Sequence, residues 1–329
     1  MSLKLTCEGK SVAEGGLSRS QLGKMLKDLR PTWPVHKLSK DRILKELCGN
    51  VCPLLHFVGA TRDDIKNVES REGTYYYKGE EAMNVDREYV ARGGYGEIYK
   101  ITLTMGDGTD VTFVQKISTQ GKLEEAQLIA DYSQVLDCPG IVSMKLIDDT
   151  VIMPLAAGSL KTFNGLLTHA QCKKVITVVG KVLECMAKDS VYYFDVKSDN
   201  VLFRCHSETR TEILMGDMGS IIPDEDNEYP CTHAPPCARN GFVNLDNEGC
   251  DPQRIYTYLL SVLYGTLLTG SPGPYHGQDD MFYYTSIDNL IRAIREKIGH
   301  DNKYSKALQR VYTDKKLDGL QPLSVFLKS

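Results

Sequence analysis

Alternation of apolar and polar residues divides the chain into a strand-rich part followed by a helix-rich part. From about residue 86 the sequence EYVARGGYGEIYKITLTMGDGTDVTFVQKIS alternates with the period of two that half-buried strands show. Two alternating runs meet at MGDGTD, residues 105–110, where Gly and Asp favour a turn, so this stretch predicts a β-hairpin. Residues 256–270, YTYLLSVLYGTLLTG, are almost uniformly apolar and predict a buried helix.

Two short helices are predicted ahead of the strand-rich part. Residues 17–30 and residues 39–48 each place their apolar side chains roughly on one helical face, and Ser39 is a candidate N-cap for the second helix. Residues 51–85 then form a connector, in which GTYYYKGE is a candidate strand.

Charge distinguishes the front of the chain from the remainder. Residues 1–50 contain ten Lys or Arg and five Asp or Glu, so they carry +5, whereas residues 51–329 carry −9 of the total of −4. Basic helix pairs can bind nucleic acid, and this layout resembles the SAP helix-extended-helix motif. We favour the alternative, a helical extension packed on the main domain with its Lys and Arg facing solvent.

Composition indicates an ordinary globular protein. A chain of 329 residues with 42% hydrophobic and 25% charged residues suggests two domains or one bilobal domain. No apolar run reaches the roughly 20 residues of a membrane span, and the first residues lack the apolar core of a secretory signal. We therefore expect an intracellular protein, cytoplasmic or nuclear, without a membrane partner.

The ten cysteines form no CxxC pair, and disulfide scaffolds are typically small and dense in cysteine. We therefore expect reduced thiols. Cys231, His233 and Cys237 could in principle share a zinc ion, but no fourth ligand is evident and the spacing matches no standard zinc site.

Three features of the strand-rich part suit a bound polyphosphate. Gly93, Gly94 and Gly96 would let backbone N–H groups approach phosphates, although an ordinary turn uses the same residues. Lys116 ends the strand TFVQKI, where a buried ammonium needs an anionic partner. The following helix offers Glu124 or Glu125 as that partner. The apolar residues three and four positions after Glu125 favour it, but both remain open.

A second polar group lies in YYFDVKSDNVLF, residues 192–203, which places Asp195, Lys197 and Asn200 between two apolar edges. Asp217 follows in LMGDMGS, residues 214–220. Carboxylate and amide oxygens suit Mg²⁺ or Mn²⁺, because hard cations prefer oxygen ligands. A polar turn between a helix and a strand is the alternative for each motif taken singly.

In this order the motifs resemble those of the eukaryotic-type protein kinase family, from about residue 86 to near the end of the chain. DVKSDN has the D-x-K-x-x-N form of the catalytic loop, and Asp217-Met218-Gly219 is similar to the D-F-G motif. The segment IMPLAAGSL is similar to the hinge of kinases from large DNA viruses.

The resemblance implies an α+β, bilobal protein-kinase-like fold. It would have a small lobe over residues 86–154, formed by an antiparallel sheet with one helix, and a larger, mainly helical lobe over residues 155–329. A helical N-terminal extension over residues 1–50 and the connector at 51–85 would precede them.

The resemblance also implies site roles. ATP would be bound by the glycine loop, Lys116 with its glutamate partner, and the hinge; these residues are Gly93, Gly94, Gly96, Lys116, Glu125, Met153 and Leu155, with Ile152 near the gatekeeper position. Asp195 would accept or orient the proton of a substrate hydroxyl, and Lys197 would neutralise the γ-phosphate. Asn200 and Asp217 would bind Mg²⁺ or Mn²⁺.

Four positions depart from the family pattern. Ala91 stands where the first loop glycine is expected, Tyr193 and Phe194 replace the His and Arg of H-R-D, and Cys237 replaces the Glu of A-P-E. Without that Arg, the site should not need activation-loop phosphorylation. Lys197 resembles the serine/threonine kinases, so we expect transfer from ATP to Ser or Thr of proteins. A pseudokinase scaffold that binds partners is the alternative.

Overall fold

The computed structural model describes residues 63–92, 96–118, 137–207, 210–221, 226–275 and 280–329, together with a few single residues, which are Ser20, Gly23, His36, Ile43, Phe57, Val58, Ile129, Asp131 and Pro223. The helices predicted at 17–30 and 39–48 lie outside these ranges, apart from Ser20, Gly23 and Ile43, which have helical backbone. The helix predicted to carry Glu124 and Glu125 also lies outside them, apart from Ile129 and Asp131, both helical.

The small lobe is built on a five-stranded antiparallel sheet with the strand order β5-β6-β7-β9-β8. Its strands are β5 (Asn84–Arg92), β6 (Gly96–Thr104), β7 (Asp110–Ser118), β8 (Lys145–Ile147) and β9 (Thr150–Pro154). The predicted hairpin is confirmed: β6 and β7 pair along their whole length around a turn closed by Met105 and Thr109. Gly108 takes a φ of +80° there, which explains the glycine.

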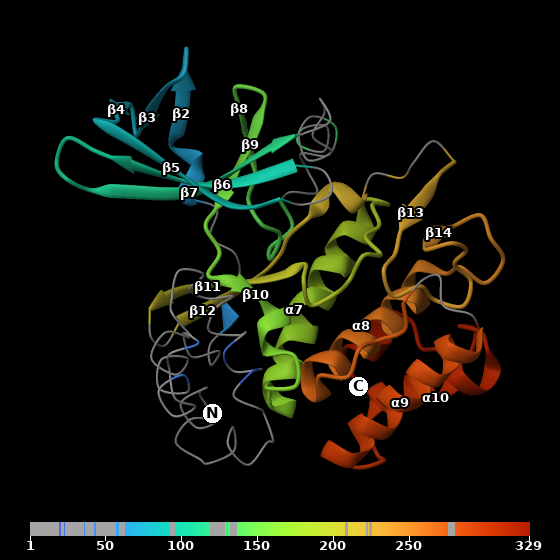
Figure 1. Cartoon of the computed structure of the whole chain (residues 1–329). Coiled ribbons are helices and arrows are strands. Elements are labelled where there is room, and N and C mark those ends of the chain that lie inside the picture. Colours follow the sequence, from blue (N-terminus) through green and yellow to red (C-terminus); the bar gives the residue numbers. More distant parts are fainter. Residues whose placement is uncertain are drawn as a thin grey trace.

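A second, three-stranded sheet covers the side of this lobe that faces away from the large lobe (Figure 1). Its strands are β2 (Val68–Arg71), β3 (Thr74–Tyr77) and β4 (Glu80–Glu81), preceded by the short helix α5 (Asp63–Lys66), so the strand predicted in GTYYYKGE is present as β3. Ile65 and Val68 are buried in one cluster with Phe113 of β7. Residues 63–81, within the predicted connector, thus pack as part of the small lobe.

The large lobe is mainly helical and lies below the sheet in Figure 1. Its helices are α7 (His169–Lys188), α8 (Pro252–Thr269), α9 (Asp280–Ile298), α10 (Lys303–Asp314) and α11 (Leu323–Phe326), with 3-10 turns η3 (Leu160–Phe163) and η4 (Met218–Ile221). The predicted buried helix is α8, whose residues from Ile255 to Leu268 are all buried. Asp251 caps its N-terminus and Pro252 occupies the first turn, where a missing N–H costs nothing.

Two smaller sheets complete the described strands. One has the order β1-β12-β11-β10 and consists of β1 (Phe57–Val58), β10 (Gly158–Ser159), β11 (Val201–Ser207) and β12 (Arg210–Met215). The other pairs β13 (Glu228–Pro230) with β14 (Phe242–Asn244). This α+β, two-lobed arrangement confirms the kinase-like fold class that the sequence predicts.

The expectation of reduced thiols is wrong for four cysteines. Disulfides join Cys138 to Cys185 and Cys237 to Cys250. The first pair is 47 residues apart and the second 13, so the fold brings together cysteines that no local spacing motif marks. Cys172 and Cys231 are free and buried. Within the described ranges, no helix has the length and apolarity to cross a membrane.

Candidate active site

The loop between α7 and β11 brings together three predicted site residues, with Lys197 and Asn200 bonded to the carboxylate of Asp195. Asp195 and Asn200 are buried, with 6% and 7% of their surfaces exposed. Lys197 Nζ donates to Asp195 Oδ2 at 2.6 Å, and Asn200 Nδ2 donates to the same oxygen at 3.0 Å. A polar turn facing solvent would not bury these groups against one another, so the three side chains form one buried hydrogen-bonded cluster.

The charge state of Asp195 follows from these neighbours. Burial by itself would raise the pKa of the carboxyl, but the Lys197 ammonium and the hydrogen bonds from Thr232 outweigh it and hold the pKa below its ordinary value. Asp195 is therefore ionised at neutral pH. It can accept a hydrogen bond, or a proton, from a hydroxyl brought against it.

Tyr193 connects this loop to the segment that carries Asp217. Its phenol oxygen accepts from Asn200 Nδ2 at 2.8 Å and donates to the Gly216 carbonyl at 3.4 Å. Burial, together with the nearby charge of Asp195, raises the pKa of the Tyr193 phenol well above its ordinary value, so it remains a donor. Every side-chain hydrogen bond of Asn200 is donated by its Nδ2 group. In the described part of the chain, no donor is bonded to its Oδ1 atom.

Asp217 lies directly after β12 and faces the small lobe. Its φ of +55° is in the left-handed region, which non-glycine residues adopt rarely and Asp and Asn most often. Its side chain is 45% exposed, and Oδ1 lies 3.8 Å from Lys116 Nζ. The Gly216 N–H bonds the Asn200 carbonyl at 2.8 Å, so the two predicted metal ligands come from adjoining backbone.

Lys116 reaches Asp217 from β7 and is only 8% exposed. Since side chains alternate across a sheet and Lys116 pairs with Val151 of β9, Val151 and Met153 share the face of the sheet that bears Lys116. Ile152 lies on the opposite face, in the cluster with Phe113. Ile152, which the resemblance places near the gatekeeper position, therefore does not share a face with Lys116, and which residue of β9 would border a nucleotide stays a prediction. Leu155 follows β9 directly and is half-buried.

The glycine loop is described only at its end. Gly96 is buried and begins β6, paired with Ser118. The register of β5 against β6 shifts between Tyr89 and Ala91, so a bulge precedes the loop. Gly93 and Gly94 lie outside the described residues, as do Glu124 and Glu125.

Thr232 is a site residue that the sequence did not single out. Its backbone N–H and its hydroxyl both donate to Asp195 Oδ1, at 3.2 and 2.5 Å, and the hydroxyl accepts from Lys197 Nζ at 3.1 Å. Thr232 therefore fixes the carboxylate and the ammonium relative to each other. The sequence offers only a weak signal, a hydroxyl residue between Cys231 and His233. In the structure both neighbours are buried.

Phe194, which replaces the Arg of H-R-D, is held by aromatic rings. Its ring packs edge-on against Tyr229 of β13 at 5.5 Å, stacks parallel to Tyr192 at 6.1 Å and lies 5.5 Å from Tyr256 of α8. Phe194 and Tyr256 are fully buried. Apolar packing thus holds Tyr229, in the segment after Asp217, against the loop that carries Asp195.

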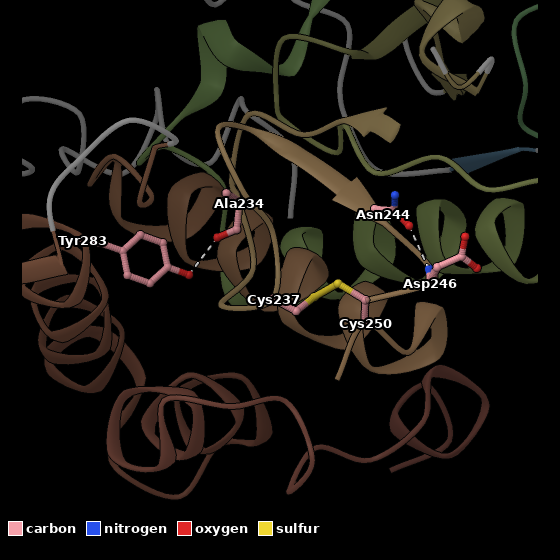
Figure 2. Close-up of a disulfide and its surroundings, with 6 residues drawn as sticks. All are labelled: Ala234, Cys237, Asn244, Asp246, Cys250 and Tyr283. Atoms are coloured by element: carbon pink, nitrogen blue, oxygen red, sulfur yellow. Dashed lines mark hydrogen bonds between the residues drawn. A yellow bond between two sulfur atoms is a disulfide. The ribbon is translucent and has the colours of Figure 1, made fainter. Parts of the chain in front are cut away.

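The segment that carries Thr232 is anchored farther along by a disulfide (Figure 2). Cys237, at the position of the A-P-E glutamate, is bonded to Cys250, immediately before the N-cap of α8. The Ala234 carbonyl accepts from Tyr283 of α9 at 2.7 Å and from Tyr258 of α8 at 3.3 Å. The zinc alternative at Cys231, His233 and Cys237 is excluded, because the Cys237 sulfur is already bonded.

The donor set fits a magnesium ion that is bound together with phosphate. Asp217 offers an exposed carboxylate and Asn200 an amide oxygen, both hard ligands. Among the described residues, no group of three or more His, Cys, Asp or Glu side chains could hold a metal ion by itself. Phosphate oxygens would therefore have to complete the coordination, as is usual for Mg²⁺ at nucleotide sites.

Comparisons with known proteins found similar solved structures, but no similar family model or curated sequence. No protein-family model matches the chain, and no curated protein matches it in sequence. Among solved structures, a double mutant of the Mycobacterium tuberculosis PknI kinase domain is similar with a TM-score of 0.49 and 15% identity, and the unmutated PknI kinase domain with 0.46 and 15%. Each alignment covers 75% of this chain and 94% of the PknI domain.

Proposed function

We propose that this protein is an ATP-dependent protein kinase that transfers the γ-phosphate of ATP to Ser or Thr hydroxyls of protein substrates. One observation carries the proposal: Lys116 from the small lobe meets Asp217 from the large lobe, and Asp217 adjoins the loop in which Lys197 and Asn200 surround Asp195. Two ammonium groups, two carboxylates and an amide from separate stretches thus lie close to one another.

Phosphoryl transfer depends mainly on positioning and on charge compensation, and in the proposed reaction each group would have a task of this kind. Asp195, ionised and held by Thr232, would accept or orient the proton of the acceptor hydroxyl. Lys197, 2.6 Å from Asp195, would neutralise charge on the transferred phosphoryl group. Lys116 would bind the α- and β-phosphates. Bound Mg²⁺ or Mn²⁺ would compensate the charge of the phosphates, with Asp217 and Asn200 as its protein ligands.

The preference for Ser and Thr rests on Lys197 and Thr232. Lys197 stands two residues after Asp195, as the resemblance to serine/threonine kinases requires. Its bond to the Thr232 hydroxyl links the loop to the segment expected to border a protein substrate. We expect phosphoserine or phosphothreonine in the product and no phosphotyrosine.

A transfer assay tests the proposal. The purified full chain would be incubated with ATP labelled at the γ-phosphate, Mg²⁺ and a mixture of acidic and basic proteins, followed by phosphoamino-acid analysis. Labelled Ser or Thr that is absent with Asp195→Asn supports the kinase. Nucleotide binding without transfer would favour the pseudokinase scaffold instead.

The same preparation tests the third function suggested by the basic front segment. Binding to nucleic acid that vanishes on deletion of residues 1–50 and weakens steeply with salt would support nucleic-acid binding by that segment as the main function. Binding that is absent, or that does not respond to salt, would reject that function.

Phosphatase treatment of the protein should leave its transfer rate unchanged. Phe194 offers no charge to a phosphorylated activation segment, and its packing on Tyr229 already fixes that segment. The measurement compares initial rates before and after complete dephosphorylation, which is verified by intact mass. A rate that falls toward that of Asp195→Asn would show that phosphorylation is needed after all.

Replacement of Lys197 by Met should move the acidic limb of the pH–rate profile to higher pH. The ionised form of Asp195 is the active one, so activity is lost as pH falls through its pKa, which Lys197 lowers. Without the ammonium, burial still raises the pKa of Asp195 while the attraction of the nearby charge is lost, so the limb should move to higher pH. The measurement is kcat/KM for a peptide between acidic and neutral pH. A lower but parallel profile would contradict this electrostatic account.

A further inference from the structure

Thr232 reaches Asp195 only if the segment that carries it keeps its path over the large lobe. This segment, residues 231–237, runs from Cys231 to Cys237, whose disulfide partner Cys250 lies immediately before the N-cap of α8. Its near end is fixed by the bonds of Thr232 to Asp195 and Lys197. Its far end is fixed by the bond between Cys237 and Cys250 (Figure 2).

Between these ends, the anchoring contacts are hydrogen bonds to backbone groups. His233 Nδ1 lies 2.8 Å from the Pro274 carbonyl, and the Ala234 carbonyl accepts from Tyr258 and Tyr283. Burial lowers the pKa of the His233 imidazole, so this ring is neutral at physiological pH. Among the described residues, no ion pair joins residues 231–237 to the rest of the lobe. The disulfide is therefore a covalent anchor of this segment, in addition to the burial of Cys231, His233 and Ala234 and the bond from the Cys231 N–H to the Gly241 carbonyl.

We propose, on the basis of the proposed kinase function, that the Cys237–Cys250 disulfide positions Thr232 against Asp195 and Lys197, so that efficient transfer to a protein substrate requires this bond. Cys237 and Cys250 are positioning residues, because they act through Thr232 and touch neither the nucleotide nor the reacting hydroxyl. Lys116 and Asp217 are held by β7 and β12, outside the segment. Loss of the bond should therefore impair use of the protein substrate more than nucleotide binding.

The bond is open to reduction by a dithiol. Cys237 is half-buried whereas Cys250 is 4% exposed, so a thiolate of dithiothreitol would attack the sulfur of Cys237 and release the Cys250 thiolate. The second thiol of the reagent then displaces Cys237 and closes a cyclic disulfide. Two electrons and two protons pass from the reagent to the cysteine pair. Reoxidation of the cysteine pair reverses this transfer of electrons and protons.

The kinetic test uses Cys237→Ser, Cys250→Ser and the double variant. We expect kcat/KM for a peptide substrate to fall about tenfold to a hundredfold, because misplacement by about an ångström is enough for such losses. The KM for ATP and the Kd for nucleotide with Mg²⁺ should stay at the wild-type values. The two single variants and the double variant should be equal, because each removes the same bond. Wild-type protein reduced with dithiothreitol should show the same kinetics as these variants.

The matched control is the double variant Cys138→Ser and Cys185→Ser, which removes a disulfide outside residues 231–250. It should keep wild-type peptide kinetics at temperatures where it is folded. Wild-type peptide kinetics in the Cys237 and Cys250 variants would overturn the proposal. Equal losses in peptide use and nucleotide binding would overturn it too, since they would indicate general destabilisation.

Hydrogen exchange separates this inference from the proposed function. The Thr232 N–H donates to Asp195 Oδ1, so its exchange should accelerate on reduction or in Cys237→Ser, and stay slow in the control variant. This readout needs no catalysis. If wild type transfers no phosphate, the kinase proposal fails while exchange at Thr232 still tests the anchor. Unchanged protection of Thr232 after reduction would refute the anchor even in an active kinase.

Discussion

Asp195→Asn is expected to lower the rate of phosphoryl transfer by about 10²–10⁴-fold, the usual contribution of a positioned acid or base. The amide cannot accept the substrate proton and carries no charge to pair with Lys197 at 2.6 Å. The Asn side chain has the same shape, but its NH2 group cannot accept the bonds that one carboxylate oxygen receives from Thr232 or from Lys197 and Asn200. The measurement is kcat at saturating ATP and peptide.

Asp199→Asn is the matched control for this prediction. Asp199 lies in the same loop, four residues from Asp195, but its side chain is 41% exposed and pairs with Lys161 at 2.5 Å. Surface ion pairs contribute little, so this variant should keep nearly wild-type turnover. Equal losses in both variants would mean that the loop, rather than the Asp195 carboxylate, limits the rate.

Asp217→Ala should have the second large effect, about a 10³-fold loss of turnover, because a metal ligand contributes several kcal/mol to charge stabilisation. The Asp217 carboxylate is exposed toward the small lobe, 3.8 Å from Lys116, and phosphates and Mg²⁺ would bind beside this pair. The variant should also need much more Mg²⁺ for the residual activity. The measurement is a Mg²⁺ titration of the initial rate at fixed ATP.

Asp149→Ala controls for the backbone of Asp217. Asp149 is exposed in the turn between β8 and β9 and has a φ of +58°, close to the +55° of Asp217. The two variants therefore bear a similar conformational cost of alanine in the left-handed region. Only Asp217→Ala should change turnover and its dependence on Mg²⁺. Unaltered Mg²⁺ dependence in Asp217→Ala would remove the ligand role.

Local chemistry made much of the site predictable. D-x-K-x-x-N fixes Asp195, Lys197 and Asn200 within six residues, so that a single loop conformation brings them together. Alternation along β6 and β7 placed Lys116 on a strand correctly. In both cases short-range spacing determines which side chains can meet.

What the sequence did not reveal depends on long-range contacts. Thr232 meets Asp195 across 37 residues, and Cys138 meets Cys185 across 47, where no periodicity connects them. The sequence does not show which face of β9 Ile152 and Met153 occupy, because both residues are apolar. Only the pairing with β7 shows which of the two shares the face of Lys116.

The central claim is that Lys116, Asn200 and Asp217 bind one nucleotide and its divalent ions beside Asp195. A crystal structure with Mg²⁺ and a non-hydrolysable ATP analogue tests it most directly. We predict metal ions at about 2.1 Å from oxygens of Asp217 and Asn200, with the Lys116 ammonium bonded to the phosphates. A nucleotide bound elsewhere, or phosphates that touch none of these three side chains, would contradict the account.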